Sequence, residues 1–164
     1  MISRILLTAS LTFLVIPIAS AQTTPGQDRA VKAEMSDGKL FAMTAASSDM
    51  FEVESSKVAL EKADRADVKE FAEHMVHDHA ETTAKLLATA KADGVGTVSP
   101  PDSKYGQMTK AIRQSKGGDF NLIYSKMQVM AHQEAVALFD DYSNNANSPQ
   151  LKAFATKSLP ILKQ

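Results

Sequence analysis

The stretch that decides the fold is residues 68–90, VKEFAEHMVHDHAETTAKLLATA. Side chains suited to a buried helix face recur in it every three to four residues: Val68, Phe71, Ala72, Met75, Thr82, Leu86 and Ala90. His79 falls on this stripe, whereas His74 and His77 fall outside it. An imidazole among core positions must either satisfy its ring nitrogens internally or bind something. The stretch therefore predicts a long helix with one inward-facing histidine, which is either a hydrogen-bonded core residue or a ligand.

The same periodicity continues on both sides of this helix. Helices are expected at residues 39–63, 67–92, 104–114 and 119–143, and from Ser148-Pro149 onward. The turns around Arg65 and Ala146 are tight, and short connections force antiparallel neighbours. No alternating run of β-branched and aromatic residues indicates a strand. The pattern predicts an all-α protein, an antiparallel four-helix bundle with one long crossover between its second and third long helices, which is the ferritin-like connectivity.

Residues 1–21 have the pattern of a secretory signal peptide. Arg4 precedes a short apolar run that ends in the small residues Ala19-Ser20-Ala21. This run is short for a membrane span and no second one follows, so we expect no transmembrane segment in the mature chain. Residues 22–38 are polar and expected to fray, and residues 39–164 form the bundle domain. We therefore expect a periplasmic or secreted protein.

The composition limits both ligands and partners. The chain has no cysteine, so disulfides and thiolate metal sites are excluded, and histidine, carboxylates and methionine remain as metal ligands. It carries 18 basic and 19 acidic side chains, and loss of Arg4 leaves 17 against 19. No basic stripe appears, so nucleic acid is not an expected partner. A protein partner or a homo-oligomer stays open.

Three polar residues are expected to meet at one level of the bundle. Glu52 lies 13 residues before Arg65 and His79 lies 14 residues after it, which puts them at the same height at about 1.5 Å per residue. His132 lies about 14 residues before the second turn and reaches a comparable height. Together they can form a metal site, or a buried hydrogen-bonded Glu–His pair that fixes register. Asp78 lies one residue off the stripe and should face outward or support the site from behind.

Other site types have weaker support. A di-iron centre needs two Glu-x-x-His pairs, and no glutamate here has a histidine three residues later. No nucleophile–base pair or phosphate loop appears, so an enzyme is not the favoured interpretation. His74 and His77 can share a weakly held ion, although a solvated face is the commoner outcome. The methionines more often fill core gaps than bind Cu(I), which thioethers do suit.

Several motifs resemble the bacterial domain-of-unknown-function 4142 family. They are Phe41, Phe51-Glu52-Val53, residues 59–63, Val68-Lys69-x-Phe71-Ala72, Met75-Val76-x-Asp78-His79, Phe120, Tyr124, His132, Ala135, residues 137–139 and Leu159-Pro160-x-Leu162-Lys163. The resemblance implies a ferritin-like helical bundle in an exported bacterial protein without a demonstrated activity. It also implies that the family's polar positions fall on Glu52, Asp78, His79 and His132.

Two functions therefore stay open. One is an exported, non-catalytic bundle that is stress-related or binds a partner through its surface. The other is a metal-binding bundle that holds a divalent transition metal through Glu52, His79 and His132. Metal analysis with a His79→Ala control discriminates between them.

Overall fold

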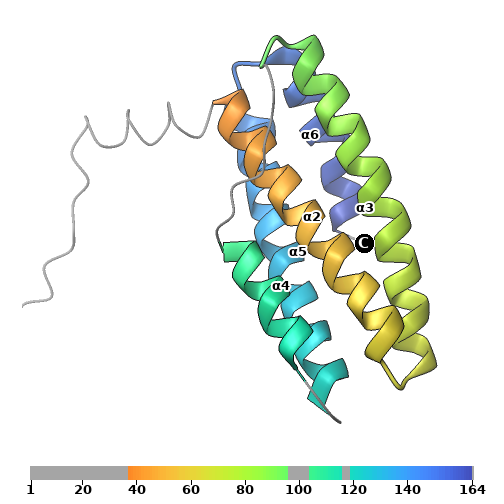
Figure 1. Ribbon diagram of the computed structural model, residues 1–164. Coiled ribbons are helices and arrows are strands. Elements are labelled where there is room, and N and C mark those ends of the chain that lie inside the picture. Colours follow the sequence, from red (N-terminus) through yellow and green to blue (C-terminus); the bar gives the residue numbers. More distant parts are fainter. Residues whose placement is uncertain (1–36, 96–103, 116–118, 164) are drawn as a thin grey trace, which may run out of the picture.

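The computed structural model describes residues 37–95, 104–115 and 119–163, and these contain five helices and no strand. The helices are α2 (Gly38–Lys62), α3 (Ala66–Ala92), α4 (Lys104–Gln114), α5 (Phe120–Asn145) and α6 (Pro149–Leu162) (Figure 1). The all-α prediction is confirmed, with bounds close to the expected ones. The expected signal peptide, most of the polar segment after it and residues 96–103 of the long crossover lie outside the described residues.

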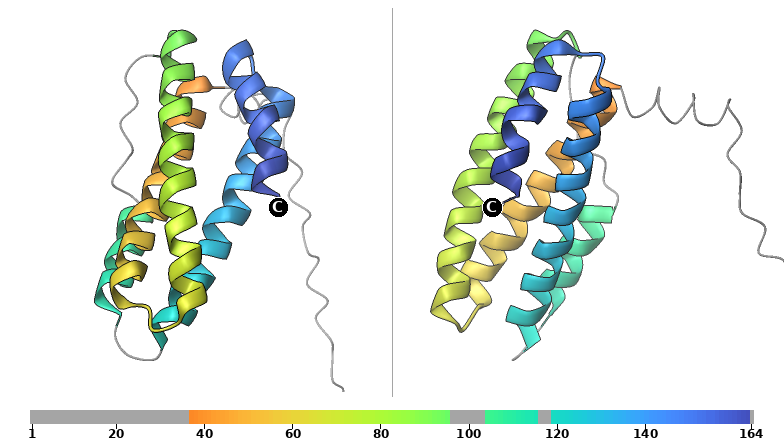
Figure 2. Two further views of the ribbon diagram at one scale, coloured as in Figure 1. Left: turned by 90° about the vertical axis from the view of Figure 1, so that its right-hand side faces the viewer. Right: turned by 180° about the vertical axis from the view of Figure 1, so that it is seen from behind.

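The helices form two hairpins with a shorter helix beside them. The α2–α3 pair lies side by side, as does α5–α6, and α4 packs on α2 and α5 (Figures 1 and 2). Helix α6 has 14 residues whereas α3 has 27, and Figure 2 shows that α6 ends well before the far end of the bundle. Part of the α3–α5 side is therefore not covered by α6. None of the described helices has both the length and the hydropathy that crossing a bilayer requires.

Local signals mark the start of α2 and the end of α3, whereas a contact from another part of the chain caps α6. The Asp37 carboxylate begins α2 by accepting from the backbone N–H of Lys39 at 2.8 Å, and Gly94, with φ of +72°, follows the end of α3. Ser148 occupies the expected N-cap position of α6 but makes no side-chain cap bond. Instead Asp93, at the end of α3, accepts from the Leu151 backbone N–H at 2.8 Å and from the Ser148 hydroxyl. A side chain of another helix thus caps α6.

The core consists of two apolar clusters with a polar layer between them. One cluster surrounds Phe51 and Tyr124, and the other surrounds Phe41 and Leu86. Along each of the long helices α2, α3 and α5, polar side chains fall between the residues of the two clusters. Asp49 on α2, His79 on α3 and His132 on α5 lie between the two clusters, and Glu52 and Gln128 lie next to them among residues of the Phe51 cluster. The layer is therefore built jointly by three helices.

Candidate functional site

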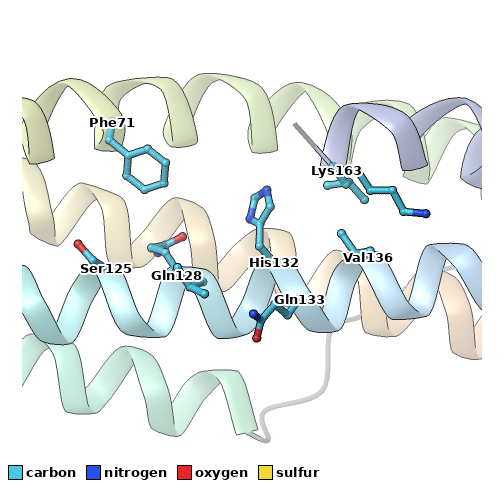
Figure 3. Close-up of a pocket in the computed structure, with 9 residues that line it drawn as sticks. Phe71, Ser125, Gln128, His132, Gln133, Val136 and Lys163 are labelled. Carbon is cyan, nitrogen blue, oxygen red and sulfur yellow. The ribbon is translucent and has the colours of Figure 1, made fainter.

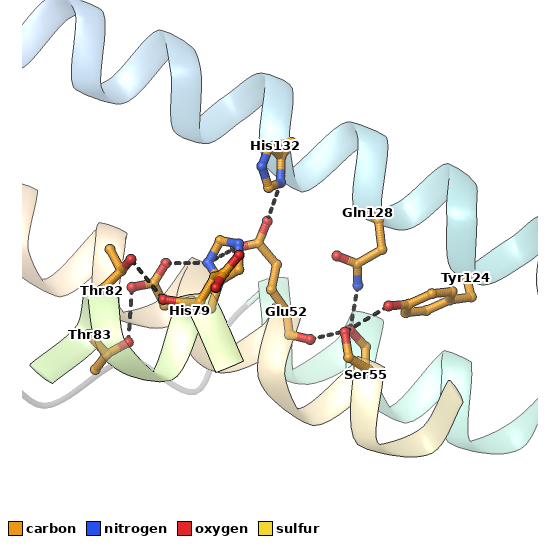
Figure 4. A network of polar contacts seen from close by, with 11 residues as sticks. Glu52, Ser55, His79, Thr82, Thr83, Tyr124, Gln128 and His132 are labelled. Carbon is orange, nitrogen blue, oxygen red and sulfur yellow. Dashed lines mark hydrogen bonds and ion pairs between the residues drawn. The ribbon is translucent and has the colours of Figure 1, made fainter. Parts of the chain in front are cut away.

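A single carboxylate bridges two imidazoles in the polar layer. Glu52 is 0% exposed, and its Oε2 lies 2.9 Å from Nδ1 of His79. Its Oε1 lies 2.9 Å from Nδ1 of His132 (Figure 4). The expected contact between Glu52 and His79 is present, and His132 approaches them from α5. The structure thus brings together Glu52, His79 and His132. Their similar numbers of residues from the two tight turns had predicted that they lie at one height in the bundle.

Asp49 belongs to the same cluster, and the sequence analysis missed it. Its Oδ1 lies 2.8 Å from Nδ1 of His79, and its Oδ2 accepts a hydrogen bond from the Thr83 hydroxyl at 2.9 Å. Asp49 lies three residues before Glu52, and this spacing puts both carboxylates on one face of the helix. The spacing is the sequence signal from which Asp49 could have been predicted as a member of the cluster. The Nδ1–H of His79 is aligned with Asp49, while Oε2 of Glu52 has no hydrogen bond and lies within ion-pair distance of the same nitrogen.

Asp78 takes no part in the cluster. Its side chain is 68% exposed, and its Oδ1 lies 2.9 Å from Nδ1 of the exposed His77. One residue along an α-helix is a rotation of about 100°, which turns Asp78 away from the face that carries His79. Of the two expectations for Asp78, the outward one is correct and support of the site from behind is wrong. Asp49 is the carboxylate that holds His79. His74 and His77 are exposed, as expected.

The buried charges perturb one another. Burial lowers the pKa of His79, but the hydrogen bond to Asp49 and the contact with Glu52 outweigh burial and raise this pKa to about 10. Burial raises the pKa of Glu52, yet the hydrogen bond from His132 and the contact with His79 outweigh burial and leave this pKa below its usual value. Burial dominates at Asp49 and raises its pKa. When these carboxylates are ionised they only accept hydrogen bonds, and the Nδ1 that faces each of them then carries the proton.

A second set of polar contacts holds α5 against α2 next to the cluster. Nε2 of Gln128 donates to Oγ of Ser55 at 2.7 Å, and the Ser55 hydroxyl donates to the backbone carbonyl of Glu52 at 3.3 Å. One turn before Gln128 in α5, the Tyr124 hydroxyl lies 2.7 Å from Oγ of Ser56 (Figure 4). These contacts fix the rotation of α5 and therefore the position from which His132 reaches Glu52.

The cluster has the dimensions of a metal site. Glu52, His79 and His132 each offer a ligand atom, and these atoms lie within 4.8 Å of one another. Zinc bonds of 2.0–2.1 Å in a tetrahedron put ligand atoms about 3.3 Å apart. The contacts of 2.8–2.9 Å are shorter because a proton joins each pair. A metal ion that replaced these protons would require the hydrogen-bonded atoms to separate by about 0.5 Å and the more widely spaced ligand atoms to approach one another.

The cluster is accessible from one side of the bundle. A groove of about 690 Å³ lies between α3 and α5, and its lining includes Phe71, His132 and Leu162 (Figure 3). The His132 side chain is 33% exposed, whereas His79 and Glu52 behind it are 7% and 0% exposed. The groove begins where α6 ends. His132 is therefore the member of the cluster that a molecule from solvent meets first.

The chain belongs to the family described as Domain of unknown function (DUF4142), which matches residues 21–164. The resemblance inferred from the sequence motifs is thus confirmed. No curated protein and no solved structure matches the chain. The family carries no assigned activity, so any functional conclusion must come from the site itself.

The raised pKa of His79 predicts that stability depends on pH. A histidine with an ordinary pKa of 6.5 when unfolded and about 10 when folded stabilises fully below pH 6.5, and this contribution is lost as pH rises toward 10. Its upper limit is about 5 kcal/mol. In urea unfolding with EDTA, the wild-type free energy of unfolding should fall over this window, and His79→Gln should flatten the fall. His77→Gln, on the exposed face, is the control. An unchanged slope in His79→Gln would refute the assignment.

Proposed function

We propose that the protein binds a divalent transition metal ion through Glu52, His79 and His132, with the carboxylate of Asp49 as a fourth ligand. The observation that carries this proposal is the convergence of three ligand atoms, from three different helices, within 4.8 Å. Imidazole nitrogens suit zinc, copper, nickel and iron, and carboxylate oxygens complete such ligand sets. The groove beside His132 gives the ion a path into the bundle.

The free energies involved favour a bound metal ion over the protons that join these groups in the structure. Removing a proton from a group with a pKa of about 10 at pH 7 costs about 4 kcal/mol. Structural zinc sites supply roughly 10–16 kcal/mol of binding free energy at that pH. Charge points the same way, because a dication neutralises the carboxylates of Asp49 and Glu52 while both imidazoles stay neutral. Binding should therefore release protons and strengthen as pH rises.

We also propose that the bundle is ferritin-like in its connectivity. Two helical hairpins, α2–α3 and α5–α6, are joined by a connection that carries α4 along α2 and α5. A single long connection between two hairpins is the feature that distinguishes this arrangement from a simple up-and-down bundle. Metal sites of such bundles are built from side chains on facing helices, and Glu52, His79 and His132 supply side chains of that kind here.

A second candidate function is a non-catalytic, stress-related or partner-binding role in which the cluster is structural only. The observation in its favour is that both imidazoles already have carboxylate partners at hydrogen-bond distance. A buried ion pair of this kind fixes which helices meet and at what height. The two candidates differ in one measurable property, which is whether the cluster retains metal.

Metal retention separates these candidates. The full-length protein, dialysed against Zn²⁺ and then against metal-free buffer, should retain about one ion per chain by elemental analysis. Glu52→Gln and His79→Gln should each weaken Zn²⁺ binding at least about 100-fold by calorimetric titration, and Asp49→Asn about 10-fold or more.

The matched controls are His74→Gln and His77→Gln, which remove exposed imidazoles from the same helix and should leave the affinity unchanged. Equal metal content in wild type, Glu52→Gln and His79→Gln would reject the metal site and leave the structural role. Loss of metal in the two surface variants instead would move the site to the outside of α3.

We propose, finally, that the protein is exported. The supporting pattern is Arg4, a short apolar run and the small residues before Gln22. Mass spectrometry of protein from the periplasmic fraction should give a chain that begins at Gln22, and Ala21→Leu should block this cleavage. Recovery of a chain that retains residues 1–21 from the cytoplasmic fraction alone would contradict export.

A further inference from the structure

Both oxygens of the Asp49 carboxylate have partners, and the two partners differ in kind. Oδ1 lies 2.8 Å from Nδ1 of His79, and Oδ2 accepts a hydrogen bond from the Thr83 hydroxyl at 2.9 Å (Figure 4). Thr83 lies four residues after His79 on α3, and this spacing puts the two side chains on one face of the helix. One oxygen of Asp49 thus belongs to the cluster, while a hydroxyl from α3 holds the other.

The Thr83 hydroxyl departs from a common behaviour of threonine within a helix, which is to donate to the backbone carbonyl four residues earlier. Thr82 makes this bond to Asp78 at 2.9 Å, and Thr89 makes it to Lys85 at 2.8 Å. These are the other two threonines of α3. Of the three, Thr83 is the one that donates to a side chain of another helix. This difference points to a role for its hydroxyl at the carboxylate.

The bond from Thr83 is compatible with a metal ion on Asp49. A carboxylate that ligates a metal is deprotonated, so its oxygens only accept hydrogen bonds and the hydroxyl is the donor. The hydrogen bond engages Oδ2 and leaves Oδ1, which lies beside His79, to face an ion. Asp49 would therefore ligate through one oxygen, whatever its protonation in the metal-free protein.

The number of ligand atoms decides which metal ions suit the site. Glu52, His79 and His132 offer one atom each, and Asp49 with a single free oxygen brings the number to four. Four nitrogen and oxygen ligands in a tetrahedron suit Zn²⁺. Mn²⁺ prefers an octahedron rich in oxygen ligands, and a second oxygen from Asp49 would move the site toward that arrangement.

We propose that Thr83 is a positioning residue that keeps Asp49 monodentate and thereby makes the site select four-coordinate ions of the zinc type over Mn²⁺. This inference rests on the proposed metal function, and it adds the class of ion and a residue outside the ligand set that selects it. Thr83 does not touch the ion in this role and acts only through the carboxylate of Asp49.

Thr83→Val tests the proposal, because valine keeps the shape of threonine and removes the hydroxyl. In competition titrations the ratio of Zn²⁺ affinity to Mn²⁺ affinity should fall at least about tenfold in this variant, a loss typical of groups that orient metal ligands. Co²⁺ reports the coordination number, since four-coordinate Co²⁺ absorbs visible light far more strongly than six-coordinate Co²⁺. The visible bands of the Co²⁺-loaded protein should therefore weaken in Thr83→Val.

Two further variants separate the hydroxyl from the fold. Thr83→Ser keeps a hydroxyl at this position and should retain the wild-type affinity ratio and spectrum. Thr82→Val is the matched control, because it removes the neighbouring hydroxyl, which donates to the backbone of its own helix. It should also behave as wild type. All variants are made in the full-length chain and titrated beside the wild-type protein.

Failure of this proposal differs from failure of the metal site. A wild-type protein that binds neither Zn²⁺ nor Co²⁺ would overturn both. A metal-binding Thr83→Val protein with the wild-type affinity ratio and spectrum would overturn only the selection by Thr83. An equal loss of Zn²⁺ and Mn²⁺ affinity would make Thr83 a general stabilising contact, and a Thr83→Ser protein that resembles Thr83→Val would assign the effect to shape. Either of these results would also overturn the proposal.

Discussion

The structure depends on one buried carboxylate. Glu52 is fully enclosed, and a charge in that position costs several kcal/mol unless it is paired and hydrogen-bonded. Its partners come from two other helices, His79 on α3 and His132 on α5. All three helices must therefore arrive at one height and in one rotation. Removing a single partner would leave the charge uncompensated, which typically costs about 3–5 kcal/mol.

This constraint explains how the fold and the site are related. The polar layer separates the two apolar clusters, so sliding one helix along another would bury charged groups against hydrocarbon and expose apolar ones. The layer that fixes the register is also the only described place where three potential ligand atoms converge. The His132 side of this layer lines the groove between α3 and α5. A structural requirement in the core thus also supplies the chemistry of the site.

Periodicity in the sequence predicted the helices and the meeting of Glu52 with His79, because equal residue counts from a tight turn give equal heights. It did not predict Asp49, which follows Ser47 and Ser48 and interrupts no apolar stripe. The capping of α6 by Asp93 was also missed, since that contact joins residues 55 and 58 positions apart. The groove depends on how far α6 extends over α3 and α5, and local patterns do not show this. The features that the sequence did not predict therefore depend on contacts between residues that are far apart in the chain.

The bridged site requires that carboxylates hold the Nδ1–H groups of both inward-facing histidines, His79 and His132. A long-range ¹H–¹⁵N correlation spectrum of the histidine rings, recorded on EDTA-treated protein near pH 7, measures the protonation of each ring nitrogen directly. We expect His79 to be protonated on both nitrogens and His132 to carry a proton on Nδ1. An unprotonated Nδ1 in either His79 or His132 would contradict the bridged arrangement on which the site depends.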